Sequence, residues 1–125
     1  MKTAQVSIEL IIVVGLLTIV LFFLIGLTAT KKIETAKEEA YLNQHNQCLR
    51  LSSLILETYV SGNGTTMLDK IAFNATILPS SRSIEVFNKE SVYCTIPINR
   101  ISSVTLNKGL IEIKNVGDFV DVSNK

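Results

Sequence analysis

Residues that could support catalysis or metal binding are scarce in this sequence. Its 125 residues contain two cysteines and a single histidine, which are too few for a cluster of metal ligands. It contains no glycine-rich phosphate loop and no nucleophile elbow, and no constellation of acid, base and nucleophile residues can be recognised. We therefore expect a protein that is not an enzyme and that needs no metal ion or other cofactor.

An excess of charge of one sign is also lacking. Lysine and arginine (12) nearly balance aspartate and glutamate (11), so that the net charge is +1. There is no basic tract either, and binding to nucleic-acid phosphates requires a concentration of positive charge. A nucleic-acid partner is therefore not expected.

Charge is absent altogether from residues 10–30, a run of 21 residues. As a helix this run would be about 32 Å long at roughly 1.5 Å per residue, which matches the hydrocarbon thickness of a bilayer. A helix that is apolar on every side has no use on the surface of a soluble domain. We expect residues 5–30 to lie in a membrane or in an equally dry surrounding. Glu9, the lone carboxylate at the start, marks a candidate site because an unpaired charge there is costly.

The first residues do not form an ordinary secretory signal. Such a signal has an apolar core of about 7–15 residues followed by a small-residue cleavage site. Here the run is longer, and no A-x-A site follows it before Lys31. Instead, positions 5–9 read Q-V-S-I-E directly before the apolar run. This start resembles the Q-x-S-x-E motif of archaeal class III signal peptides, the type IV pilin-like precursors. A plain, uncleaved membrane anchor is the alternative.

The resemblance implies how the chain is processed. In that family a membrane aspartic peptidase of the prepilin type cuts just before the Gln, which here means a leader of residues 1–4 and cleavage between Ala4 and Gln5. Glu9 then becomes the fifth mature residue, where pilins carry a carboxylate, and it could pair with the new α-amine of a neighbouring subunit. Ser7 fits as a polar residue of the first turn. In the alternative, Glu9 is a headgroup-level charge favoured by the helix dipole.

Two glycines could help such helices to pack. Gly15 and Gly26 are eleven residues apart, so at about 100° per residue they lie within roughly 20° of one another around the helix. Small residues on one side let membrane helices approach closely, although glycine is also common in membrane helices without that role. We expect both glycines to belong to the assembly surface.

The helix is predicted to continue as an amphipathic segment over residues 31–60. Residues 31–59 contain neither proline nor glycine, and a strong breaker follows at positions 61–64. Apolar residues recur every seven positions, which predicts one apolar face. We expect Leu49, Ile55 and Leu56 to pack on the rest of the protein. The two series are Tyr41, Cys48, Ile55 and Leu42, Leu49, Leu56.

Residues 61–125 change to a period of two, which predicts β-strands. We expect a small antiparallel sheet with one face covering the helix, and thus an α+β fold with the layout of type IV pilins. Pro97 predicts that its strand ends there or lies at an edge, and positions 107–109 predict a three-residue hairpin with Gly109 left-handed. The expected strands cover residues 71–77, 84–86, 92–98, 104–106, 111–113 and 119–122.

Two further pairs of residues are candidate sites. Cys48 and Cys94 could form a disulfide between the helix and a strand, or could be two buried free thiols; we favour the bridge if this part is extracytoplasmic. Asn63 and Asn74 begin N-x-T patterns of the kind that accept N-linked glycans.

Charge and the leader motif give opposing indications of the orientation in the membrane. Lys31 and Lys32, which follow the apolar run, weakly favour a cytoplasmic C-terminal part, but nearby glutamates offset their charge and the leader motif implies an outward head.

We expect a membrane-inserted precursor that becomes the subunit of an extracellular filament at the cell surface. It would assemble with copies of itself or related pilins and serve surface attachment. The alternative is a membrane-anchored surface-binding protein or a minor pilin-like assembly or tip component.

Overall fold

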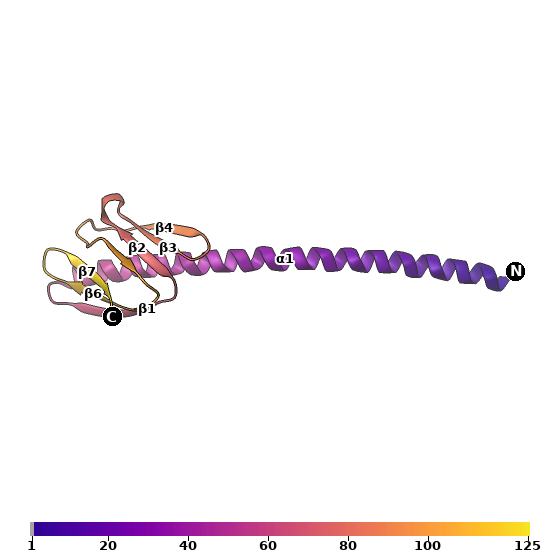
Figure 1. Cartoon of the computed structure of the whole chain (residues 1–125), viewed down its shortest axis with the longest axis horizontal. Helices are drawn as coiled ribbons and strands as arrows, with labels where there is room; N and C mark the ends of the chain where they lie inside the picture. The colour runs from indigo at the N-terminus through magenta and orange to yellow at the C-terminus, as the bar shows by residue number, and fades with distance from the viewer. Residues whose placement is uncertain (1) are drawn as a thin grey trace. The chain divides into compact units, whose positions relative to one another are not determined.

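The computed structural model describes the backbone of residues 2–125 and the side chains of residues 7–125. One long helix, α1, spans Lys2–Val60 (Figure 1). The chain divides into an N-terminal unit, Met1–Glu39, and a head unit, Ala40–Lys125. Helix α1 contributes residues to both units. The predicted long N-terminal helix is thereby confirmed, including its end at the Ser-Gly-Asn-Gly breaker.

The head unit combines the last part of α1 with short antiparallel strands. All strand pairs within the two sheets are antiparallel, and the sheets have the orders β1-β6-β7 and β4-β3-β2-β5. The predicted α+β layout is confirmed, but the strands divide between two sheets where one was expected. The elements are β1 Thr66–Ile71, β2 Asn74–Leu78, the 3-10 turn η1 Pro79–Ser81, β3 Ser83–Phe87, β4 Ser91–Thr95, β5 Val104–Leu106, β6 Gly109–Asn115 and β7 Val120–Asn124.

The expected strand over residues 71–77 is in fact the junction of two strands. β1 ends at Ile71 and β2 begins three residues later. The side-chain amide of Gln47 on α1 holds this corner: its Oε1 accepts the backbone N–H groups of Ala72 and Phe73 at 2.8 and 3.0 Å, and its Nε2 donates to the Phe73 carbonyl at 3.0 Å. A helix side chain thus replaces the ladder bonds that an uninterrupted strand would make.

The prediction of a hairpin at residues 107–109 is wrong. β5 pairs with β2, whereas β6 pairs with β1 and β7, so this connection crosses from one sheet to the other. Gly109 does have a positive φ of 142°. The crossing is held by side-chain amides, because Asn74 and Asn124 accept the backbone N–H groups of Lys108 and Asn107 at 2.8 and 3.0 Å.

The edge strand predicted from Pro97 is confirmed. β4 ends at Thr95, two residues before this proline, and it lies at the edge of its sheet. Proline has no N–H to donate to a neighbouring strand, which suits the end of an edge strand.

The core of the head unit lies between the helix and the sheets. Leu51 and Ile55 on α1 are completely buried, whereas Leu49 is 50% and Leu56 38% exposed. The prediction was right for Ile55 and wrong for Leu49 and Leu56, because the sheets cover the neighbouring side of the helix. The buried strand residues that complete the core include Ile71, Ile77, Ile84, Val86, Ile96, Leu106, Ile111, Ile113, Val120 and Val122.

A buried asparagine closes the end of α1. Asn115 is 2% exposed, and its Nδ2 donates to the carbonyl oxygens of Thr58 and Tyr59 at 3.1 and 3.0 Å. Its Oδ1 accepts the Gly117 N–H at 2.9 Å. The last carbonyls of a helix have no partner within the helix, so Asn115 satisfies two of them from β6.

Asn115→Ala is expected to lower the free energy of unfolding by about 1–3 kcal/mol, since it leaves one buried carbonyl, one partly buried carbonyl and one N–H without their partner. Chemical denaturation followed by circular dichroism measures the change. Asn88→Ala in an exposed turn is the matched control and should alter the value by less than about 0.5 kcal/mol. Equal effects of both substitutions would contradict the capping role.

Candidate functional site

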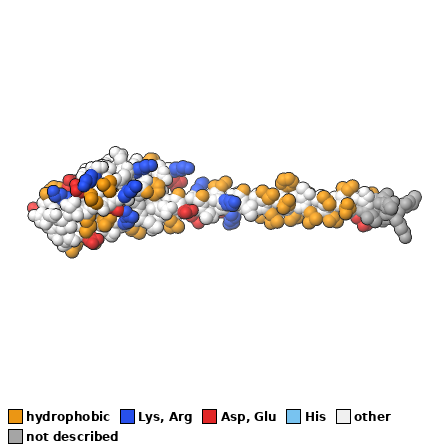
Figure 2. Space-filling view, turned by 90° about the horizontal axis from the view of Figure 1, so that it is seen from below, with side chains coloured by type: hydrophobic (Ala, Val, Ile, Leu, Met, Phe, Trp, Pro, Cys, Tyr) orange, Lys and Arg blue, Asp and Glu red, His pale blue; other side chains and the backbone are white. Residues whose placement is uncertain are grey.

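The uncharged part of α1 is apolar on all sides and nothing within its own unit covers it. The large apolar side chains between Ile8 and Leu27 are each 48–69% exposed. Figure 2 shows hydrophobic side chains along this part of the helix, with charged side chains gathering where residues 31–39 follow. By length and composition this is the one helix among the described residues that could cross a membrane.

The few polar side chains within the apolar run are satisfied by the helix itself. The hydroxyls of Thr18, Thr28 and Thr30 donate to the carbonyls of Val14, Leu24 and Gly26, four residues earlier, at 2.8–3.1 Å. Hydroxyls bonded in this way can be buried without an unsatisfied donor. The run therefore suits a surrounding without water.

The candidate site at the start of the run is Glu9. Its side chain is exposed, as is that of Ser7, and within residues 7–125 no cationic group forms an ion pair with it. A partner for this carboxylate in a dry surrounding must therefore come from outside these residues. The predicted cleavage residues, Ala4 and Gln5, lie outside the residues whose side chains are described, so that cleavage stays a prediction.

The two helix glycines leave open space. A Cβ placed on Gly15 or Gly26 would meet no heavy atom within 4 Å. The described chain itself therefore does not use the room that these glycines provide. Their place in a packing surface between helices stays a prediction.

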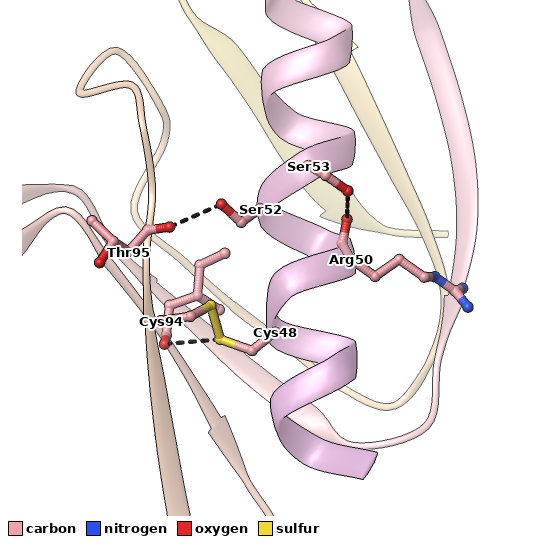
Figure 3. Close-up of a disulfide and its surroundings, with 7 residues drawn as sticks. Cys48, Arg50, Ser52, Ser53, Cys94 and Thr95 are labelled. Atoms are coloured by element: carbon pink, nitrogen blue, oxygen red, sulfur yellow. Dashed lines mark hydrogen bonds between the residues drawn. A yellow bond between two sulfur atoms is a disulfide. The ribbon is translucent and has the colours of Figure 1, made fainter. Parts of the chain in front are cut away.

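The cysteines are joined as a disulfide between α1 and β4. Figure 3 shows the bond between Cys48 and Cys94, whose Cα atoms are 6.0 Å apart. One turn further along the helix, the Ser52 hydroxyl donates to the Thr95 carbonyl at 2.9 Å. The bridge that the sequence favoured over two free thiols is present, and it fixes the helix to the edge strand.

Reduction of this disulfide is expected to destabilise the head unit by roughly 4 kcal/mol in the chain-entropy model, because the bond closes a separation of 46 residues. Melting followed with and without a reductant measures the loss. The variant Cys48→Ala/Cys94→Ala serves as the control, since its melting should not respond to the reductant. If the reductant left the wild-type melting temperature unchanged as well, the bridge would not constrain the fold.

Both glycosylation patterns begin at an exposed asparagine. Asn63 is in the loop after α1, and Asn74 is at the start of β2. The Asn74 Oδ1 accepts the Lys108 N–H, which leaves Nδ2, the atom that carries an N-linked glycan, without a role in that bond. Attachment of a glycan is compatible with both positions and stays a prediction.

A groove of about 350 Å³ on the head unit is lined in part by side chains that already serve the fold. Gln47 holds the β1–β2 corner, and Arg50 pairs with Asp69 and donates to the Lys70 carbonyl at 3.2 Å. The lining residues are Asn43, Asn46, Gln47, Arg50, Lys70, Ala72 and Phe73.

The lone histidine stacks on an aromatic ring of the same helix. The His45 ring stacks on Tyr41 with centroids 6.1 Å apart. Among the described residues there is no group of three or more His, Cys, Asp or Glu side chains that could hold a metal ion.

No protein-family model, no curated protein and no solved structure matches this chain. The uncovered apolar helix and the disulfide-bonded head unit are the features of the chain itself that bear on its function.

Proposed function

We propose that this protein is a structural subunit of an extracellular filament of the type IV pilus kind. Its apolar helix lies in the membrane before assembly and among the helices of other subunits afterwards, and its head unit faces outward for surface attachment. Processing by a prepilin-type peptidase between Ala4 and Gln5 belongs to the same proposal.

One observation carries the proposal: the apolar run of α1 is exposed on every side. Side chains of this kind are stable only when lipid or other apolar helices cover them. Lipid can cover them before assembly, and identical helices from neighbouring subunits can cover them in a bundle. The self-satisfied threonines permit either surrounding.

Two further features support an outward head unit and a filament. The Cys48–Cys94 disulfide favours an oxidising compartment outside the cytoplasm. Glu9 supplies a carboxylate at the start of the apolar run, and cleavage before Gln5 would supply an α-amine close to it along the chain. A pair formed between neighbouring subunits would fix the stagger of their helices.

A membrane-anchored surface protein is the second candidate. It is favoured by the length of the apolar run, which at about 32 Å fits a bilayer without any further partner. In that case lipid remains the permanent cover of the helix, and no polymer forms. A minor pilin-like assembly or tip component would share the helix but be present in few copies.

The N-terminus of the protein in sheared surface filaments tests the proposal. Mass spectrometry is expected to find Gln5, in free or cyclised form, as the first residue of abundant chains in that fraction. The same measurement on the membrane fraction is the control, because it contains subunits before assembly. A first residue at Met1, or absence of the protein from all filaments, would favour the anchored protein.

A further inference from the structure

An exposed aromatic ring stands beside Asn74 on the outer face of the four-stranded sheet. In the antiparallel pair of β2 and β3, Asn74 lies directly opposite Phe87, and side chains at opposite positions share a face, with Cβ atoms about 4.5–5.5 Å apart. This face is the outer one, because the next pair, Ala75 and Val86, is buried in the core. Phe87 itself is 55% exposed. An uncovered apolar ring therefore neighbours an asparagine that begins an N-x-T pattern.

The hydrogen bond of the Asn74 side chain favours a position of its nitrogen near this ring. The Asn74 Oδ1 accepts the N–H of Lys108 at 2.8 Å. Lys108 follows β5, which lies on the opposite side of β2 from β3. Because Oδ1 and Nδ2 diverge from the same carbon atom, the bond to Lys108 favours Nδ2 on the side of β3, where Phe87 lies.

A pocket of about 300 Å³ includes both Asn74 and Phe87 in its lining. Asn88 and Lys108 bring an amide and an ammonium group to it, and both groups donate hydrogen bonds. The volume is at the lower end of the roughly 300–1,000 Å³ of small-ligand pockets, so the pocket suits a single sugar ring. The remaining lining residues are Ala72 and Phe73.

We propose that Asn74 carries an N-linked saccharide whose first ring packs on Phe87 in this pocket. A pyranose ring has a face of C–H bonds, which the electron-rich face of an aromatic ring attracts, and it has hydroxyls that Asn88 and Lys108 can bind. Because the sugar is tethered, it can fill a shallow pocket that would not retain a free sugar. The inference rests on the proposed function only in that the head unit must be exported, which the anchored-protein alternative also provides.

Attachment of the sugar requires an activated donor, and the chemical class that fits is a lipid-linked glycosyl phosphate at the outer membrane face. The new bond joins the Asn74 Nδ2 to C1 of the sugar. The bond from C1 to the phosphate oxygen breaks, the lipid phosphate leaves with the bonding electrons, and one Nδ2 proton passes to a base of the transferase. The amide keeps its Oδ1, and with it the bond to Lys108.

The other acceptor pattern has a different surrounding. Asn63 lies in the loop between α1 and β1, so no strand register places an aromatic ring opposite it. Its side chain lies over the β6–β7 turn, since a Cβ built on Gly117 would be 3.6 Å from the Asn63 Cγ and Nδ2 atoms. Asn63 therefore serves as the comparison site in the experiments.

Mass spectrometry of the full chain from its native cells tests the modification. Trypsin cuts after Lys70 and Arg82, so that the peptide of residues 71–82 contains Asn74 but not Asn63. This peptide is expected to be heavier by one or more sugar residues in most chains. Thr76→Ala should abolish the added mass, whereas Thr76→Ser, which keeps an acceptor pattern, should retain it. An unmodified Asn74 in the wild-type protein would overturn the inference.

Melting of the full chain with and without the sugar tests the contact with Phe87. Each protein is made in its native cells and in a host that forms disulfides but lacks N-glycosylation, and Asn63→Gln is present throughout so that only Asn74 can be modified. Loss of the sugar is expected to lower the melting temperature by at least about 3 °C, because the Phe87 ring loses its cover. In the Phe87→Ser background the same loss should lower it by less than about 1 °C, since the cycle isolates the contact between the two groups.

The outcomes separate this inference from the proposed function. An equal change in melting temperature in both backgrounds would overturn the packing on Phe87. A sugar at Asn74 that stabilises a protein found in no filament would support this inference and overturn the filament. Filaments built from chains with an unmodified Asn74 would overturn this inference and leave the proposed function intact.

Discussion

Leu51→Ala is expected to lower the free energy of unfolding of the head by about 2–5 kcal/mol. Leu51 is completely buried at the centre of the helix face that contacts the sheets, so its truncation removes apolar contacts and leaves a cavity. The measurement is urea denaturation of the soluble fragment 31–125 with the disulfide intact. A loss of this size is a large part of the stability of a small domain.

Leu49→Ala is the matched control, since it makes the same chemical change two residues earlier on the same helix. Its side chain is half exposed, and the expected loss is below about 1 kcal/mol because little buried surface is removed. If Leu49→Ala proved as costly as Leu51→Ala, the helix would have to be rotated about its axis relative to the sheets.

The sequence was sufficient for the features that depend on local patterns. The uncharged run, the absence of proline and the breaker after residue 60 predicted α1 to its C-terminal end. The alternation of apolar and polar residues located most of the strands, and Pro97 correctly indicated an edge strand. In each case the physical cause lies within a short window of sequence. It is the period of the apolar residues, a turn-forming segment, or the missing N–H of a proline.

The choice between two apolar faces of the helix could not be made in this way. The series through Leu42, Leu49 and Leu56 and the face through Cys48, Leu51 and Ile55 are both apolar at helical spacing, and only the packing of the sheets decides which is buried. Of the first predicted series, Cys48 and Ile55 lie in the core but Tyr41 is exposed, and all three leucines of the second series are exposed.

Buried polar groups were missed for a related reason. Asn115 caps α1 from 57 residues away along the chain, and the amide of Gln47 replaces strand pairing at a corner 25 and 26 residues further on. Gln44 is 3% exposed and donates to the Glu90 carbonyl at 3.0 Å. Such bonds join residues that share no local pattern, and polar side chains are ordinarily assigned to the surface.

The candidate site is better defined by sequence than by structure. Glu9 is distinctive because no other carboxylate lies next to a 21-residue uncharged run, and that property needs no tertiary information. Its partner, however, belongs to another copy of the chain in the proposed filament. A single chain can show only that the carboxylate is exposed and that the described residues provide no cation for it.

Glu9→Ala and Glu9→Gln are expected to deplete the protein from filaments at least tenfold while leaving the head folded. In lipid, Glu9 at the start of the apolar run can reach headgroups and water. In a filament core it is dry and needs a cation, which the α-amine of a neighbouring processed subunit would supply. Removing one member of a buried ion pair leaves the other uncompensated, at a cost of about 3–5 kcal/mol.

The measurement is the ratio of each variant in sheared-filament and membrane fractions, relative to wild type. Glu39→Ala is the matched control, since Glu39 is an exposed carboxylate on the same helix but lies beyond the apolar run, and its ratio should stay within twofold of wild type. Melting of the Cys48–Cys94-bonded head should be the same for all these proteins, because Glu9 belongs to the other unit. Normal incorporation of Glu9→Ala into filaments would mean that the Glu9 carboxylate lies at the membrane surface and takes no part in assembly. The contact that sets the stagger of the helices would then have to lie elsewhere on α1.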